Sequence, residues 1–181
     1  MIFDPFPVFL PSQYRVKFAT EPWEQRGAAT LRRAVFCREQ GIFVRDDSDE
    51  IDAVAIPIVA ISSFGVTLNE VVGTVRIHEA EPNVWWGSRL AVAPDYRRIG
   101  ALGSSLVRLA VSSAHARGCK RFFAHVQSQN ALLFQRLHWT TIEEVSFYGR
   151  PHHFMEADLA HYPPFADAEI GFLSLPSKKA A

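Results

Sequence analysis

The sequence predicts a mixed α/β domain in which one central sheet is flanked by helices. Short apolar-rich runs with strand-like composition recur along the chain, and segments with helical spacing of apolar residues separate them. Turn-forming Gly, Pro, Asn and Asp residues stand between consecutive strand-like runs. We therefore expect a mixed, mostly antiparallel sheet of about six to seven strands.

The first half of the chain predicts a strand, a helix and an antiparallel meander. Tyr14 to Ala19 alternates as a strand does. Residues 21–40 follow as a helix, with Thr20 as its N-cap and Gly41 at its end. The meander is expected at residues 54–61, 71–78 and 84–92.

The second half predicts a long helix, a buried strand, a short helix and two closing strands. Gly118 stands at the expected C′ position of the long helix. The expected bounds are 103–117 and 130–138 for the helices, and 121–126, 141–147 and 153–159 for the strands.

The expected domain spans residues 14–162. Residues 1–13 carry Pro5, Pro7 and Pro11, which interrupt any helix there, so we expect an extended arm. Residues 163–181 show little periodicity, and we expect this tail to fray.

Composition excludes several classes of protein. With 181 residues, 48% of them apolar, the chain can bury one core, and its 19 basic and 19 acidic residues cancel, which argues against a nucleic-acid partner. Cys37 and Cys119 form no CxxC pair or Cys/His cluster, so we expect no metal and a reducing compartment. No apolar run reaches the roughly 20 residues needed to cross a bilayer. We expect a cytoplasmic protein without a membrane partner.

One segment predicts a phosphate site. An apolar strand leads into a basic, glycine-containing turn and then into a helix. The first amides of a helix have no partners within it and point outward as anion donors, and Arg97 and Arg98 add positive charge there. The expected phosphate-binding residues in this segment are Arg97, Arg98, Ile99, Gly100, Ala101, Leu102, Gly103 and Ser104.

This segment resembles the signature of the GNAT superfamily of N-acetyltransferases, a strand of the form L-x-V-x-P followed by R-x-x-G-x-G/A and a helix. The resemblance implies the GNAT fold, with acetyl-CoA as acyl donor: the loop amides bind its pyrophosphate. It also implies that the strand binds the pantetheine arm, which adds Leu90, Ala91 and Val92 to the expected cofactor-binding residues. Counting from Arg97 aligns Gly100 with the signature, whereas counting from Arg98 aligns Gly103. The register of the loop therefore stays open.

Residues 127–139 resemble the GNAT segment N-(x)6-Y-x-x-x-G-F. Gln127 stands where Asn is usual, and Phe134 stands where Tyr often protonates the departing thiolate of CoA. The resemblance thus adds Gln127 and Phe134 to the cofactor site but leaves the acid role empty, so that water or the thiolate itself must serve. As an ordinary core helix, the same segment would turn Leu132, Leu133 and Leu137 inward.

Two further segments resemble a GNAT subgroup. Residues 32–40 match R-x-x-VF-x-x-EQ, with an acidic run from Asp46 to Asp52 after it, and residues 149–155 match G-x-PH-x-x-M. The catalytic candidates for removing a proton from an amine are Glu39 and His152, although either could have a structural role instead.

Other residues near these segments have two interpretations. Arg76 and Arg89 would either contact an acidic acceptor or pair with the acidic run, and pairing is favoured. Trp85 and Trp86 are expected in the core, with one of them lining the acceptor site as the alternative.

The leading hypothesis is an acetyl-CoA-dependent N-acetyltransferase that acts by direct attack of a small-molecule primary amine on the thioester. One alternative is an enzyme like acyl-homoserine-lactone synthase, which shares the fold but uses an acyl-carrier protein and S-adenosylmethionine. Another is a GNAT-like module that binds CoA without turnover. The identity of the acceptor and the oligomeric state stay open, with a homodimer as one arrangement.

Overall fold

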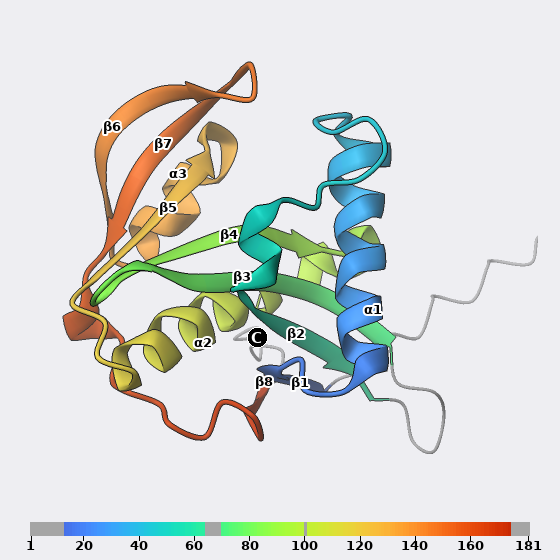
Figure 1. Ribbon diagram of the computed structural model, residues 1–181, viewed down its shortest axis with the longest axis horizontal. Coiled ribbons are helices and arrows are strands. Elements are labelled where there is room, and N and C mark those ends of the chain that lie inside the picture. Colours follow the sequence, from blue (N-terminus) through green and yellow to red (C-terminus); the bar gives the residue numbers. More distant parts are fainter. Residues whose placement is uncertain (1–12, 64–69, 100, 175–181) are drawn as a thin grey trace, which may run out of the picture.

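The computed structural model describes residues 13–63, 70–99 and 101–174, which form one sheet with helices on both faces (Figure 1). Its eight strands lie in the order β6-β7-β5-β4-β3-β2-β1-β8. Only β4 and β5 are parallel among the paired strands of these ranges. The predicted mixed, mostly antiparallel sheet is therefore confirmed. Within these ranges, no helix is long and apolar enough to cross a membrane.

The elements follow the predicted order closely. The strands are β1 (Tyr14–Phe18), β2 (Ile56–Ser62), β3 (Glu70–Glu81), β4 (Val84–Val92), β5 (Arg121–Gln127), β6 (Trp139–Phe147), β7 (Arg150–Ala157) and β8 (Phe172–Ser174). The α-helices are α1 (Pro22–Arg32), α2 (Leu102–Ala116) and α3 (Ala131–Arg136). A π-helix, η1, covers Arg33–Glu39, and short 3-10 helices are η2 (Glu50–Ala53), η3 (Pro94–Ile99), η4 (Ser128–Asn130) and η5 (Leu159–His161).

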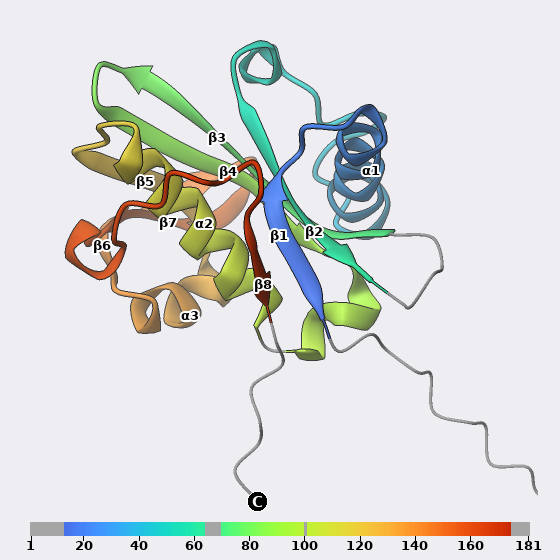
Figure 2. The ribbon, with the colours of Figure 1, turned by 90° about the horizontal axis from the view of Figure 1, so that it is seen from below.

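Helices α1 and α2 cover opposite faces of the sheet, as Figure 2 shows from below. Alternation along β2 explains why both faces are buried. Ile58 and Ala60 pack into the large core that includes α2, whereas Val59 and Ile61 pack into a separate cluster with Ala28 of α1. The sheet therefore separates an α2 side from an α1 side, and anything that crosses it must pass between strands.

The first helix differs from the predicted continuous α-helix over residues 21–40. It begins at Pro22 with Glu21, and not Thr20, as its N-cap. The carboxylate of Glu24 accepts hydrogen bonds from the amides of Thr20 and Glu21 at 2.8 and 3.0 Å. After Arg32 the chain widens into the π-helix, where the amide of Gln40 donates to the carbonyl oxygen of Val35, five residues back. π-Helical segments redirect the side chains that follow them and are frequent at functional sites.

Residues 163–174 do not behave as the fraying tail that the sequence predicts. The amide of Phe18 donates to the carbonyl oxygen of Ala168, and β8 then pairs with β1 as an edge strand. Gly171 makes this approach feasible: its φ is +72°, and an added Cβ would lie 1.8 Å from the carbonyl oxygen of Val16. The sequence does not reveal β8, because a strand of three residues is too short to show a periodic pattern.

The core interpretation of residues 130–138 was wrong in part. Leu132 and Leu133 are 58% and 42% exposed, and Leu137 is only partly buried. Because α3 has just six residues, it buries one short face, formed by Ala131 and Phe134.

The favoured pairing of the acidic run is confirmed, because the run folds back onto the sheet as an ion-pair cluster. We call this set the Arg–Asp cluster; its members are Arg32, Arg76, Arg89, Asp47, Asp49 and Asp52. Asp47, only 2% exposed, binds Arg32 at 2.7 Å and Arg89 at 3.0 Å. The cluster thereby ties α1, β3 and β4 to the loop before η2.

The charges of this cluster are mutually stabilised. Hydrogen bonds from Arg76 lower the pKa of Asp49 below its ordinary value. Burial alone would raise the pKa of Asp52, but hydrogen bonds from Arg32 and Arg76 outweigh burial and leave this pKa far below its ordinary value. These carboxyl groups therefore take up protons more readily in the unfolded state than in the folded state. Their contribution to stability is complete above the unfolded carboxyl pKa of about 4. It is lost as the pH falls from there through the lower pKa of the folded state.

Replacing one buried member of the cluster should destabilise the fold strongly. Asp47→Asn leaves two buried arginines without their shared carboxylate, and we expect a loss of about 3 kcal/mol in the free energy of unfolding. The neighbouring Asp46, which is exposed and lies 3.9 Å from Arg33, is the matched control, and Asp46→Asn should leave the denaturation midpoint unchanged. Equal midpoints for the two variants in urea unfolding would contradict this account.

Candidate active site

The most distinctive feature of the sheet is the gap between β4 and β5. These strands pair only from Val84–Arg121 to Trp86–Phe123, after which they separate, as Figure 1 shows. Beyond that point β5 continues to pair with β7, through Gln127. A cavity of about 480 Å³ fills the gap. It is lined by Val107, Ala110 and Phe134 on the α2 side, and by Phe43, Asp49 and Ile51 on the α1 side.

A β-bulge in β4 faces this cavity. Thr74 pairs with Ala91 and Arg76 with Ser88, so two residues of β4, Arg89 and Leu90, oppose one of β3. Arg89 adopts φ +58°, the left-handed conformation typical of one bulge class. This bulge points the Arg89 side chain into the Arg–Asp cluster.

A backbone amide of β4 next to the bulge is directed at the gap. The amide of Ala93 donates to the carbonyl oxygen of Val72, and Gly73 pairs with Val92. In an antiparallel pair, residues alternate between facing the partner and facing away. The amide of Val92 therefore faces away from β3, whereas that of Ala91 faces β3; Leu90 belongs to the bulge, where this alternation is interrupted. Of the three predicted strand residues, Val92 thus has an amide directed at the gap.

The predicted phosphate loop becomes η3 followed by α2. The guanidinium of Arg97 is already occupied: it donates to Glu39 at 2.6 and 2.7 Å and to the carbonyl oxygen of Val92 at 2.9 Å. Arg98 is exposed and has no ion-pair partner among the described residues. An added Cβ on Gly103 would meet no atom within 4 Å, so the first turn of α2 is open to a ligand.

The remaining predicted loop residues lie as follows. Ala101 is the N-cap of α2, and Leu102 is buried in the core at 1% exposure. The hydroxyl of Ser104 donates back to the carbonyl oxygen of Ala101 at 3.1 Å. Ile99 ends η3, and Gly100 lies outside the described residues.

The structure does not bring Glu39 into the cavity. Its side chain, 40% exposed, forms the surface ion pair with Arg97 rather than with Arg38 or Arg32. Hydrogen bonding from Arg97 lowers the pKa of Glu39 below its ordinary value, which makes this carboxylate a weaker base. Its part in the chemistry stays a prediction.

His152, by contrast, lines the cavity and is only 5% exposed. Its Nδ1 lies 2.9 Å from the carbonyl oxygen of Arg150. A carbonyl oxygen only accepts hydrogen bonds, so Nδ1 carries the proton and Nε2 of the neutral ring keeps its lone pair. The contact with β7 thus leaves Nε2 of His152 free to accept a hydrogen bond.

Two further histidines line the same cavity, and neither was predicted from the sequence. His125 on β5 stacks on Phe147 at 4.6 Å, and the partial burial of its ring, with the nearby charge of His152, lowers the pKa of His125. Burial beside Arg76 also lowers the pKa of His78 on β3, whose buried Nδ1 has no hydrogen-bond partner among the described residues. Strand alternation alone could not have shown that they converge, because they come from strands that are far apart in sequence.

Gln127 and Phe134 also line the cavity. The amide group of Gln127 donates to Oε1 of Gln40 at 2.9 Å, and Arg150 donates to the carbonyl oxygen of Gln40. Gln40 therefore joins the α1 side of the gap to β5 and β7. The ring of Phe134 packs edge-on against that of Trp139, with 5.1 Å between the centroids. The position at which the GNAT segment often has Tyr therefore carries no ionisable hydroxyl.

Comparison with known proteins identifies the relatives of this chain. Residues 17–139 match the sequence profile described as the Acetyltransferase (GNAT) family. A candidate acetyltransferase of Bacillus subtilis (strain 168) is 30% identical over 138 residues, which cover 76% of this chain and 91% of that protein.

Solved structures share the fold. A structure described as an N-acetyltransferase of Lactobacillus plantarum superposes with a TM-score of 0.70 at 20% identity, covering 80% of this chain and 97% of the other. An aminoglycoside 6'-N-acetyltransferase in complex with coenzyme A superposes with a TM-score of 0.60 at 14% identity, covering 78% and 94%.

The histidine pair makes a testable prediction about protonation. The pKa of His125 should lie below the ordinary histidine value of about 6.5, so its ring is neutral at pH 7. In His152→Gln the electrostatic contribution of His152 is lost, and the pKa of His125 should rise but stay below that value, because burial, the larger cause, persists. A histidine NMR titration measures the pKa of His125 in both proteins. A value above about 6.5 in the unmodified protein would refute the conclusion that burial lowers this pKa.

Proposed function

The chain belongs to the acetyltransferase (GNAT) family, and from this premise we propose that it transfers the acetyl group of acetyl-CoA to the primary amine of a small molecule. The observation that carries the proposal is the cavity that crosses the sheet between β4 and β5. It reaches from Val107 and Ala110 of α2 on one side to the buried His152 on the other.

The donor enters from the α2 side in this proposal. The open amides at the start of α2 and the unpaired charge of Arg98 suit a pyrophosphate group. The pantetheine arm, itself built of amides, would then run along β4, where the amide of Val92 faces the gap and that of Leu90, in the bulge, is the second candidate donor. One of these amides would also stabilise the negative charge that develops on the thioester oxygen.

The reaction is a direct acyl transfer. The amine nitrogen forms a bond to the thioester carbonyl carbon, the C–S bond breaks, and the electron pair leaves with sulfur. The nitrogen loses a proton, which Nε2 of His152 accepts, so a neutral amide and a CoA thiolate result. Because Phe134 has no ionisable proton, the thiolate leaves as an anion or takes a proton from water.

The cavity itself assists deprotonation of the amine. Its lining is mostly apolar or aromatic, and the carboxylate that reaches it, Asp49, is already bound by Arg76 and Arg89. An ammonium group would be poorly solvated there, which favours the neutral amine that attacks. The apolar surroundings lower the pKa of the ammonium group, so its proton is more easily transferred to His152.

The loop assignment predicts unequal roles for the two arginines. Arg98→Ala should raise the Kd for CoA about tenfold, since a free guanidinium that binds phosphate is lost. Arg97→Ala should change this Kd less, because Arg97 is occupied by Glu39. Gly103→Val should keep the melting temperature but weaken CoA binding, as nothing but a ligand fills that space. Calorimetric titration of each variant measures these values, and unchanged CoA affinity in Arg98→Ala and Gly103→Val would rule out the loop.

If His152 is the general base, substitutions of His152 and Glu39 should have unequal effects on kcat. His152→Gln should lower kcat about 100-fold while leaving the KM for acetyl-CoA nearly unchanged. Glu39→Gln, a change of the same kind at the surface ion pair, should keep most of the activity. Release of CoA thiol at saturating acetyl-CoA measures both. Full activity of His152→Gln would exclude it as the base.

The same assays separate this proposal from its alternatives. Thermal stabilisation by acetyl-CoA together with amine-dependent thiol release supports the transferase. Stabilisation without turnover on any amine would favour a silent CoA-binding module. Indifference to CoA, combined with stabilisation by S-adenosylmethionine, would favour an enzyme like acyl-homoserine-lactone synthase.

A further inference from the structure

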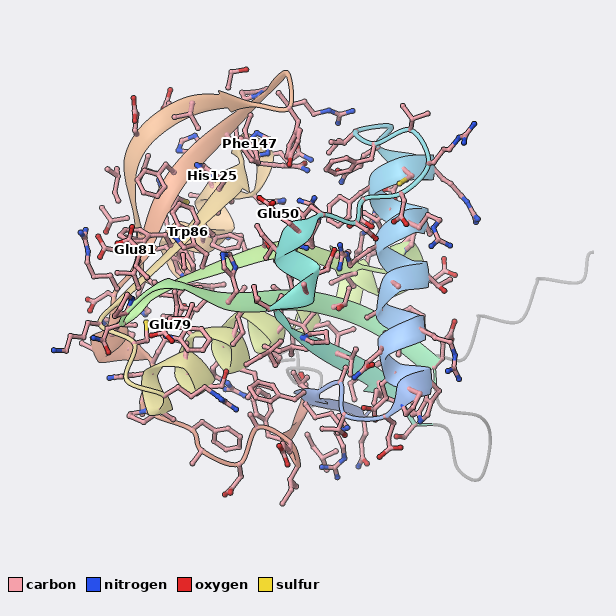
Figure 3. All side chains as sticks on the ribbon, in the orientation of Figure 1. Glu50, Glu79, Glu81, Trp86, His125 and Phe147 are labelled. Carbon is pink, nitrogen blue, oxygen red and sulfur yellow. The ribbon has the colours of Figure 1, made fainter. Side chains whose placement is uncertain are left out.

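Five rings form a continuous arc around the α1-side mouth of the cavity, and we call this arc the aromatic rim. Its members are Trp86, His125, Phe147, Tyr148 and Phe43, and all five line the cavity. Successive ring centroids along the arc lie 5.2, 4.6, 4.3 and 4.9 Å apart. Figure 3 shows Trp86, His125 and Phe147 gathered along one side of the gap, with Glu50 of η2 on the other side.

The rim belongs to the acceptor rather than to the donor. Phe43 follows the π-helix on the α1 side of the sheet, and Ile51 of η2 lines the same part of the cavity. The start of α2, where the donor is proposed to bind, is on the opposite side. Since the two substrates of a direct transfer must approach one carbonyl carbon from different directions, the rim faces the incoming amine.

The charged side chains that line the cavity are already paired with one another, so none is free to pair with a second charged group on the acceptor. Apart from histidines, the charged lining residues are Asp49, Arg76 and Arg89, and all three belong to the Arg–Asp cluster. That cluster has three arginines and three aspartates, so its charges cancel. A second ammonium group on the acceptor, or a carboxylate, would therefore be buried without an ion pair.

The turn that carries part of the rim is strained. Tyr148 and Gly149 form a two-residue hairpin turn between Phe147 and Arg150, with φ of 52° and 70°. Positive φ at both positions defines the type I′ turn, in which Asn or Asp usually precedes Gly. A tyrosine there is disfavoured, yet it places the half-exposed Tyr148 ring between Phe147 and Phe43.

We propose that the acceptor is a primary amine attached to a flat aromatic body, with no other charged group. Its ring would lie against the aromatic rim, and its amine would reach toward His152. Glu50, which is exposed and has no ion pair among the described residues, would attract the protonated amine toward the mouth from the opposite lip. This inference rests on the proposed acetyl transfer and specifies its second substrate.

The test compares four amines as acceptors with acetyl-CoA as donor: 2-phenylethylamine, butylamine, putrescine and L-phenylalanine. The first has the ring and one charge, whereas each of the others lacks the ring or carries an additional charge. We expect kcat/KM for 2-phenylethylamine to exceed each of the others about tenfold or more.

Variants then locate the recognition. Phe147→Leu keeps an apolar side chain but removes the ring face, and should raise the KM for 2-phenylethylamine about fivefold without changing that for butylamine. Phe147→Tyr should restore the original KM. Trp23→Leu removes a ring of similar exposure, 36%, from α1 outside the cavity, and is the matched control.

The outcomes distinguish the inference from the proposal on which it rests. Acetylation that favours putrescine, L-phenylalanine or butylamine would overturn the acceptor class and leave acetyl transfer standing. Equal KM increases for both monoamines in Phe147→Leu would also overturn it, because they would indicate a general disturbance. Absence of acetyl transfer to all four amines would overturn the transferase proposal and this inference with it.

Discussion

Strand β4 forms only three residue pairs with β5 before the two strands separate, and the functional part of the molecule depends on this separation. A sheet with helices on both faces is otherwise closed to small molecules, since its strands are hydrogen bonded to one another. Where β4 leaves β5, the outward-facing amide of Val92 and a cavity replace the missing ladder of hydrogen bonds. The parallel direction of this one pair also places the loop after β4 at the start of α2, beside the opening.

Strands β4 and β5 must be held apart, because neighbouring strands with unpaired edges tend to form hydrogen bonds with each other. The Arg–Asp cluster fixes the α1 side by anchoring β3, β4 and the loop before η2 through buried ion pairs. Gln40 joins that side to β5 and β7 through Gln127 and Arg150. Ion pairs of this kind have high desolvation costs and are weak evidence for added stability. Their directional geometry suits a different purpose, which is to keep the two arms of the sheet at a fixed separation.

Much of this arrangement could be predicted from the sequence, and the exceptions have physical causes. Apolar periodicity located almost every strand and helix, and the segment around Arg97 to Gly103 suggested the family through its resemblance to the GNAT signature. The widening of the first helix at Arg33 could not be predicted, because a π-helix keeps the same apolar composition. His78 and His125 were missed since their convergence depends on strand order. The contact between Glu39 and Arg97, 58 residues apart, likewise has no local signal.

The central claim is that the gap between β4 and β5 receives the thioester. A crystal structure of the protein with CoA tests it most directly. The account predicts that the pantetheine arm lies along β4 with hydrogen bonds from the amides of Leu90 and Val92, and that the sulfur points into the cavity toward His152. Density for CoA elsewhere on the surface, with the gap empty, would contradict the account.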